Sequence, residues 1–385
     1  MNFFHDLSPL STDKGILLRR LLLDHGQSVN VTPRRRLLRA GFSWLLLAIL
    51  ALSGPGQARA NPLDGYAVHL RDPDSETGIR STPANNTWPA RTAAVVRAIN
   101  WLHTQQQPDG SFGVRTADAV FLIARAGEDP DGPAWRPASF SALDALRSQI
   151  PAYLTDAGRT AKFLRAVAAA GRDVHHFAGM DLAAHLSSYY QPATGLYHPG
   201  HLYYHTLAVQ GLRLASQPLP APAVTAIIAQ QHATGGWEWR IGGPLDEVDT
   251  TGLILETLPL AAVPVSSTTV ISAVSFLAST QHPDGGWSLG AAGTTNSNST
   301  ALALAGLLAV EHHPLAAPFV HGSNTPLSAL LALQAADGGF NFMATAAGER
   351  LMATLDALDA LLRPYPGDVL PPPRLFLPFV ARPPI

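Results

Sequence analysis

The sequence contains no cysteine, and charged residues make up only 14% of its 385 residues. Disulfide bonds, thiolate zinc sites and cysteine nucleophiles are therefore excluded, and the fold depends on packing. The formal net charge is −2, and no basic block occurs after the first forty positions. A surface typical of nucleic-acid binding is therefore absent from the sequence. Hydrophobic residues make up 46%, which is enough for a large core, so we expect a globular protein.

The first sixty residues are typical of a segment that directs export. Arginines between positions 34 and 39 precede an apolar stretch over 40–53, and Ala58 and Ala60 provide small residues at a cleavage site. We expect cleavage after Ala60 and an exported or cell-surface product, by the general secretory or the twin-arginine route. The apolar stretch is shorter than the roughly 20 residues of a spanning helix, so a permanent membrane span is not expected. Residues 1–30 precede a complete signal and are interpreted as an over-extended start.

The most informative feature is internal repetition. Four segments place a glycine four residues after a glutamine, and an aromatic residue two positions further on. Apolar residues at helical spacing precede each glutamine, and the glycine ends the helix. We interpret each pair as a structural clamp, in which the glutamine amide bonds a turn or a neighbouring helix end and the ring covers the last helical turn. The pairs are Gln106 and Phe112, Gln231 and Trp237, Gln281 and Trp287, and Gln334 and Phe340.

A second apolar helix follows each clamp, and the long interval between Gln106 and Gln231 has room for two degenerate repeats. Six helical hairpins result. Neither end carries the polar capping repeat that a linear stack requires, so we predict an all-α, α/α toroid with the second helices inside. The expected organisation is a targeting segment at 1–60, a linker at 61–90, the toroid at 91–363 and a Pro-rich tail at 364–385. Second helices are predicted at 116–126, 160–170, 202–215, 249–262, 298–311 and 350–362.

The segment around Gln281 and Trp287 resembles the QW repeat of squalene and oxidosqualene cyclases. The resemblance extends over nearly all of the predicted mature chain and implies the toroid of the terpenoid-cyclase and prenyltransferase superfamily. The same toroid serves protein prenyltransferases, thioester domains and cobalamin carriers. The first two need a cysteine, which is absent here. The cobalamin carriers hold their ligand against a separate β-rich domain, which we do not expect after residue 363.

Cyclases of the squalene–hopene kind carry an Asp-x-Asp-Asp-Thr motif whose middle aspartate protonates an alkene. The matching stretch is 247–251, in which Asp249 has the position of the acid and Thr250 replaces the last aspartate. Asp246 and Glu247 would help Asp249 to keep its proton. Those cyclases also use a second toroid-like domain and lipid substrates inside the cell, both of which disfavour this reading. The alternative is that Asp249 only caps its helix, as Asn298 would in the next repeat.

A ring brings the starts of its inner helices to one mouth, where helix N-termini favour polar or anionic groups. We expect ligand contacts there from residues at or just before these starts. His201 and His205 share one helix face, but a metal would need a third ligand, so no metal is predicted. Contacts to a ligand and packing without function both remain as interpretations of this pair. The predicted ligand-binding residues are Asp118, His201, Tyr204, His205, Asp246, Glu247, Asn298 and Arg350.

These observations together predict an exported, non-catalytic toroid that binds a small, partly apolar molecule, amphipathic or isoprenoid-like, at the ring mouth. No cofactor is predicted. The first alternative is a terpene-cyclase-like enzyme with Asp249 as general acid. The second is an extracellular scaffold that contacts another protein.

Overall fold

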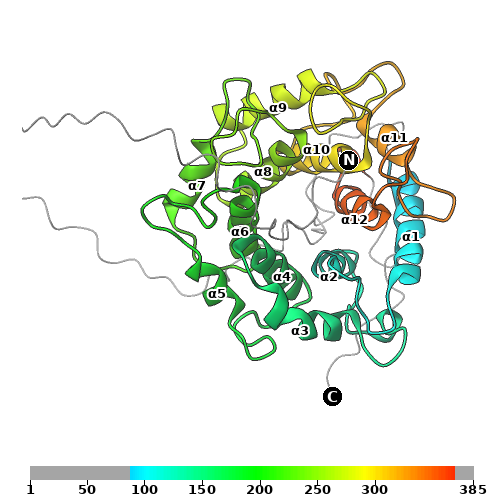
Figure 1. Cartoon of the computed structure of the whole chain (residues 1–385). Helices are drawn as coiled ribbons and strands as arrows, with labels where there is room; N and C mark the ends of the chain where they lie inside the picture. The colour runs from blue at the N-terminus through cyan, green and yellow to red at the C-terminus, as the bar shows by residue number, and fades with distance from the viewer. Residues whose placement is uncertain (1–86, 369–385) are drawn as a thin grey trace, which may run out of the picture. The chain divides into compact units, whose positions relative to one another are not determined.

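The computed structural model describes residues 87–368, which all belong to one compact unit. Within these residues, twelve α-helices alternate between an outer and an inner layer (Figure 1). The predicted targeting segment, the cleavage site after Ala60 and nearly all of the linker and tail lie outside the described residues.

The helices form a closed ring. Each inner helix packs on the next one along the chain, and the last inner helix packs on the first (Figure 1). This arrangement confirms the predicted α/α toroid of six hairpins. The outer helices are α1 (Trp88–Gln105), α3 (Ala142–Tyr153), α5 (Leu182–Ser188), α7 (Ala221–Ile228), α9 (Thr268–Thr280) and α11 (Pro326–Leu331). The inner helices are α2 (Thr116–Arg125), α4 (Ala157–Ala169), α6 (Leu202–Leu214), α8 (Val248–Leu260), α10 (Ser297–Ala309) and α12 (Arg350–Leu361).

Small residues let neighbouring inner helices approach closely. A Cβ atom added to Gly252 of α8 would lie 2.4 Å from the carbonyl oxygen of Leu302 in α10. One added to Gly306 of α10 would lie 2.7 Å from the carbonyl oxygen of Gly252. Glycine is costly within a helix, so its presence at both contact points reflects this backbone approach.

Each of the four glutamines in the repeated pattern donates two hydrogen bonds. Gln281 Nε2 donates to the carbonyl of Gly285 at 2.8 Å and to the carbonyl of Phe319 at 3.0 Å, which belongs to the following hairpin. Trp287 is fully buried, and its Nε1 donates to the Leu277 carbonyl at 2.8 Å. The clamp therefore fixes its own turn and joins it to the next hairpin.

The structure adds a partner to each clamp that the sequence did not indicate. The backbone N–H of the clamp aromatic residue donates to a threonine hydroxyl in the inner helix that follows. For Trp287 this bond is 3.0 Å long, to Thr300 Oγ1. The corresponding threonines in the other repeats are Thr116, Thr251 and Thr354. Outer turns and inner helices are thus tied together at every clamp.

Candidate active site

Asp249 is the second residue of α8, because the helix begins at Val248 and Glu247 is its N-cap residue. Its carboxylate therefore does not cap the helix, and the capping interpretation is wrong. The same holds for Asn298, because Asn296 is the N-cap of α10 and accepts from Ser299 N–H at 2.8 Å. Asp249 lies in the first turn of α8 and Asn298 in the first turn of α10, and neither side chain is used as the N-cap.

Asp249 has the environment of a carboxylic acid that keeps its proton. Burial raises its pKa to about 6, although a hydrogen bond with the Ser299 side chain opposes the shift. Its Oδ1 is buried and has no hydrogen-bond partner among the described residues. Because no cation offsets the burial, the neutral form of Asp249 persists well above the usual pH range of an aspartic acid.

Asp118 lies in the first turn of α2 and has the opposite environment. Burial alone would raise its pKa, but the nearby cations Lys162, Arg115 and Arg165 outweigh that effect and lower it. Lys162 Nζ lies 2.8 Å from Asp118 Oδ2, and the Asp118 side chain is 18% exposed. Asp118 is therefore an ionised, paired carboxylate. Two aspartates of the same ring thus differ in protonation because their surroundings differ.

The acidic residues just before Asp249 point in different directions. Glu247 Oε2 accepts from Trp239 N–H and from the Thr250 hydroxyl, each at 3.1 Å. Burial raises the pKa of Glu247 to about 7, and the charge of Asp249 contributes to the shift. Asp246 instead lies 2.7 Å from His232 Nδ1 and accepts from the Thr234 hydroxyl. Of the predicted cluster, only Glu247 and Asp249 interact.

Arg350 lies at the start of an inner helix but faces the outside of the ring. Its guanidinium bonds Asp337 at 2.5 and 2.8 Å and lies 5.0 Å from the ring centre of Trp101. These residues line a surface hollow of about 590 Å³. Arg350 is the first residue of α12, whereas Asp249 is the second residue of α8, so the two side chains do not occupy equivalent helix positions.

The histidines predicted to contact a ligand have partners within the protein. His205 is fully buried, accepts from Tyr197 N–H at 3.1 Å through Nδ1, and lies 2.9 Å from the Ala223 carbonyl through Nε2. His201 is the N-cap of α6, and its ring stacks on that of Tyr204 with centroids 3.9 Å apart. No group of three or more His, Cys, Asp or Glu side chains within residues 87–368 is arranged to hold a metal ion.

Three interior residues were not identified from the sequence. Asp356 of α12 accepts a hydrogen bond from Asn298 Nδ2. Tyr203 is within electrostatic range of both Asp249 and Asp356, whereas its neighbour Tyr204 packs toward α4 at Gly158. Lys162 is the only lysine in the described part of the chain. A charged residue in the middle of a mostly apolar inner helix was the available signal for Asp356.

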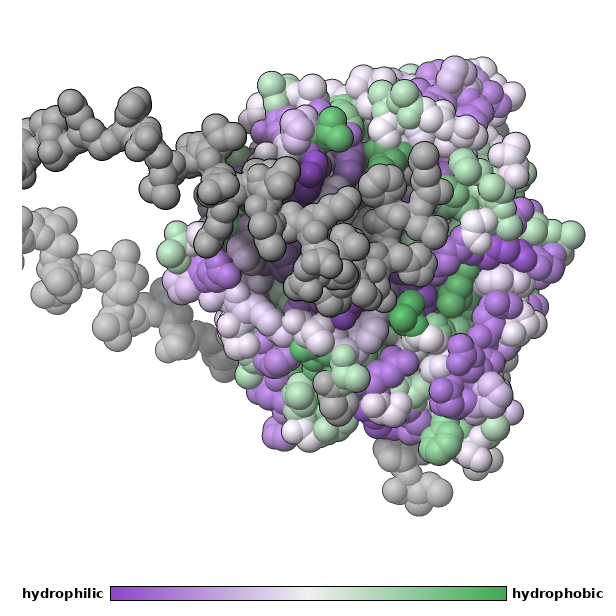
Figure 2. Space-filling model, in the orientation of Figure 1, coloured by the Kyte–Doolittle hydropathy of each residue, from purple (hydrophilic) through white to green (hydrophobic). Residues whose placement is uncertain are grey.

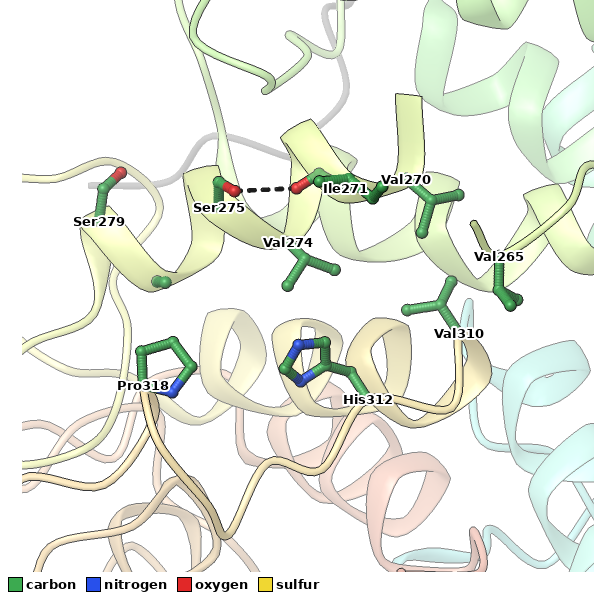
Figure 3. Close-up of a pocket in the computed structure, with 10 residues that line it drawn as sticks. Val265, Val270, Ile271, Val274, Ser275, Ser279, Val310, His312 and Pro318 are labelled. Carbon is green, nitrogen blue, oxygen red and sulfur yellow. Dashed lines mark hydrogen bonds between the residues drawn. The ribbon is translucent and has the colours of Figure 1, made fainter. Parts of the chain in front are cut away.

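A second hollow lies on the outer side of the ring, between α9 and the end of α10 (Figure 3). Its volume is about 570 Å³, and Val270 and Val274 of α9 face His312 and Pro318 across it. Neither Asp249 nor any other carboxylate is among the residues that line it. In Figure 2, hydrophilic and hydrophobic residues are mixed over the coloured part of the face shown, so that part has no broad apolar patch typical of a protein interface. Across residues 87–368, no helix has both the length and the apolar character needed to cross a membrane.

Comparison with known proteins found similarity to terpene-forming enzymes. No protein-family model matches the chain. A drimenyl diphosphate synthase from Streptomyces showdoensis is 28% identical over 222 residues, which cover 56% of this chain and 40% of that protein. A drimenyl diphosphate synthase from Streptantibioticus cattleyicolor is 29% identical over 191 residues, covering 48% of this chain and 34% of that protein. This chain therefore spans less than half the length of the curated relatives that it matches.

Among solved structures, the type II terpene cyclase MstE from Scytonema is similar, with a TM-score of 0.54 and 14% identity. The match covers 71% of this chain and 98% of that chain. A variant of the same cyclase in complex with its substrate, geranylgeranyl dihydroxybenzoate, also has a TM-score of 0.54, at 15% identity and with 71% and 97% of the two chains covered. Since the match spans nearly all of MstE, the objection that a cyclase needs a second ring does not hold for that protein.

The matched proteins are enzymes, and this finding contradicts the expectation of a non-catalytic binding protein. That expectation was wrong because it relied on the missing second toroid-like domain and on predicted export, and gave less weight to the match of Asp249 with the acid position of the cyclase motif. The described part of this chain is an α/α toroid with the fold of the terpenoid cyclases.

Proposed function

We propose that this protein is a terpene-cyclase-like enzyme in which Asp249 protonates an alkene of an isoprenoid substrate and so starts its cyclisation. The observation that carries the proposal is the state of Asp249, a buried acid with a pKa of about 6 and an unpartnered oxygen. The similarity to drimenyl diphosphate synthases and to a type II terpene cyclase supports it. The activity and the substrate of the whole protein are both part of the proposal.

The chemical step follows from the protonation state. The π electrons of a substrate double bond take the proton of Asp249, so a C–H bond forms and the Asp249 carboxylate remains. The cationic carbon is then attacked by the next double bond, which closes a ring. Burial without a neighbouring cation keeps Asp249 protonated to a higher pH than an ordinary aspartic acid, so that the proton to be donated is present. The Tyr203 ring, close to Asp249, provides an aromatic face for a developing cation.

The substrate class is proposed from the chemistry of the matched proteins. The structural neighbour binds geranylgeranyl dihydroxybenzoate, and the curated relatives are named for a terpenyl diphosphate. Both compounds combine an isoprenoid chain with a polar head. We therefore propose an isoprenoid with a polar head group as substrate here.

The test is to incubate the full-length protein in D2O with farnesyl diphosphate, geranylgeranyl diphosphate or geranylgeranyl dihydroxybenzoate. Mass spectrometry should show a cyclic isomer of the substrate that carries one solvent deuterium, because the proton on Asp249 exchanges with solvent. Asp249→Asn should abolish the product. Asp129→Asn, on an exposed residue in the loop after α2, is the control and should keep it.

Two outcomes would contradict the proposal. One is the absence of a cyclic product from all three substrates with folded wild-type protein. The other is a product from Asp249→Asn in wild-type yield, since an amide cannot donate the initiating proton.

A further inference from the structure

Asp356 is a second carboxylic acid inside the ring, and the initiating step makes no use of it. It lies near the middle of α12, an inner helix that is otherwise mostly apolar after its first residue. Asn298 Nδ2 donates a hydrogen bond to Asp356 Oδ2. The Asp356 side chain is half-buried, and within the described residues no hydrogen bond is made to its Oδ1. One oxygen is therefore held in place while the other is available.

The first turn of α10 connects this carboxyl to the proposed acid. Helix α10 packs between α8 and α12. Ser299 hydrogen-bonds Asp249 of α8, and the adjacent Asn298 hydrogen-bonds Asp356 of α12. Asn298 is 4% exposed, and its Oδ1 is buried without a hydrogen-bond partner among the described residues. Two consecutive residues of one helix thus position two carboxyls on either side of it.

The groups around Asp356 set its pKa close to neutral pH. Burial raises its pKa to about 7, Asp118 of α2 adds to the rise, and Arg115 and Lys162 oppose it together with the Asn298 bond. Tyr203 of α6 is within electrostatic range of Asp356. With a pKa of about 7, Asp356 is ionised in a large fraction of molecules at neutral pH, and its carboxylate can then accept a proton.

This inference rests on the proposed cyclisation. We propose that Asp356 is the base that ends the reaction by removing a proton from the final carbocation, and that Asn298 is a positioning residue that orients the carboxylate. A C–H bond next to the cationic carbon breaks, and its electron pair forms the new C=C bond. The proton goes to the free oxygen of Asp356. Exchange with water then returns a proton to Asp249 and removes one from Asp356, so the overall reaction is an isomerisation that needs no further reactant.

The test compares products of full-length wild-type protein and Asp356→Asn with farnesyl diphosphate in D2O, where the wild type must first be shown to be active. Substrate consumption and the initiating deuterium should persist in Asp356→Asn, because Asp249 is intact. The yield of the wild-type olefin should fall by about 100-fold, the lower range of a general base, in favour of alcohols or other double-bond isomers. Asp356→Glu should restore the wild-type olefin in part.

Asn298→Ala provides an independent measurement if Asp356→Asn fails to fold. It keeps the carboxylate but removes its hydrogen bond, so the product mixture should shift in the same direction by a smaller factor. Asp129→Asn is the matched control and should give the wild-type mixture.

The outcomes separate this inference from the proposed function. An unchanged product mixture in Asp356→Asn, with Asp249→Asn inactive, would overturn only the role of Asp356. Complete loss of substrate consumption in a folded Asp356→Asn would also overturn it, since a terminal base is not needed for initiation. Inactive wild-type protein would instead contradict the cyclisation itself.

Discussion

The side-chain amide of Gln334 donates a 2.8 Å hydrogen bond to the backbone carbonyl of Ala94 and thereby joins the last hairpin to the first. The same nitrogen donates to the Gly338 carbonyl at 2.9 Å. In the other three clamps the equivalent bond reaches the next outer segment along the chain, from Gln106 to Trp135, from Gln231 to Thr269 and from Gln281 to Phe319. One repeated device therefore both connects consecutive hairpins and closes the ring.

Gln334→Ala should lower the free energy of unfolding by about 1–2 kcal/mol, because two carbonyl groups lose a donor that is shielded from water. Urea denaturation measures the change. Gln105→Ala is the control, since within residues 87–368 its amide donates only to the neighbouring Thr104 hydroxyl. Equal midpoints for the two variants would argue against a closing role for Gln334.

Gly285→Ala tests the close approach at a clamp turn. Gly285 has φ of +90°, and an added Cβ would lie 2.6 Å from the Thr325 carbonyl oxygen. Gly127 has φ of +83° but no atom within 4 Å of the added Cβ. Gly127→Ala should therefore cost only the left-handed backbone strain of about 1–2 kcal/mol, and Gly285→Ala distinctly more. Thermal unfolding of both variants checks this difference, and similar losses would refute the steric contact.

Asp249→Asn should stabilise the protein at neutral pH while it abolishes the proposed activity. The pKa of Asp249 is raised to about 6 in the folded protein, above its usual value when unfolded. The unfolded state therefore loses its proton first, and stability falls as the pH rises from about 4 to about 6. The variant avoids a cost of up to about 3 kcal/mol above pH 7 and should match the wild type below pH 4. Urea denaturation at both pH values is the measurement, and a variant less stable than wild type at neutral pH would contradict the burial argument.

Asp118→Asn should have the opposite sign. Its pKa is lowered in the folded state by Lys162 and other cations, which outweigh burial, so its ionised form stabilises the fold above the pKa of the unfolded state. That contribution disappears as the pH falls through the lower, folded pKa. The substitution should cost about 1–3 kcal/mol at neutral pH, because Lys162 is left without its partner. The double variant with Lys162→Met should recover part of the loss, and an additive result would show that the pair does not interact.

The pH dependence of catalysis provides a further test of Asp249. If the acid must be protonated, kcat/KM for substrate consumption should fall by about tenfold per pH unit above about pH 6. Initial rates with farnesyl diphosphate between pH 5 and 8 would show this limb. A profile that stays flat across that range is incompatible with Asp249 as the proton donor.

The sequence alone determined the ring of hairpins. The clamp pattern, as around Gln281, Gly285 and Trp287, is local, because a helix end, a left-handed glycine and a covering ring lie within a few residues. The positions of the inner helices followed from their apolar runs, and Asp249 could be singled out because its motif is contiguous.

Only the tertiary structure decided which side chains meet inside the ring. Consecutive helical residues point about 100° apart, which separates the side chains of Tyr203 and Tyr204. A helix start two residues earlier than the capping interpretation requires makes Asp249 an interior acid rather than a cap. The contact between Asn298 and Asp356 joins residues from different hairpins, and no local pattern encodes it. The protonation of Asp249 and Asp118 likewise depends on which helices bury them and which cations face them, and these are properties of the packed ring.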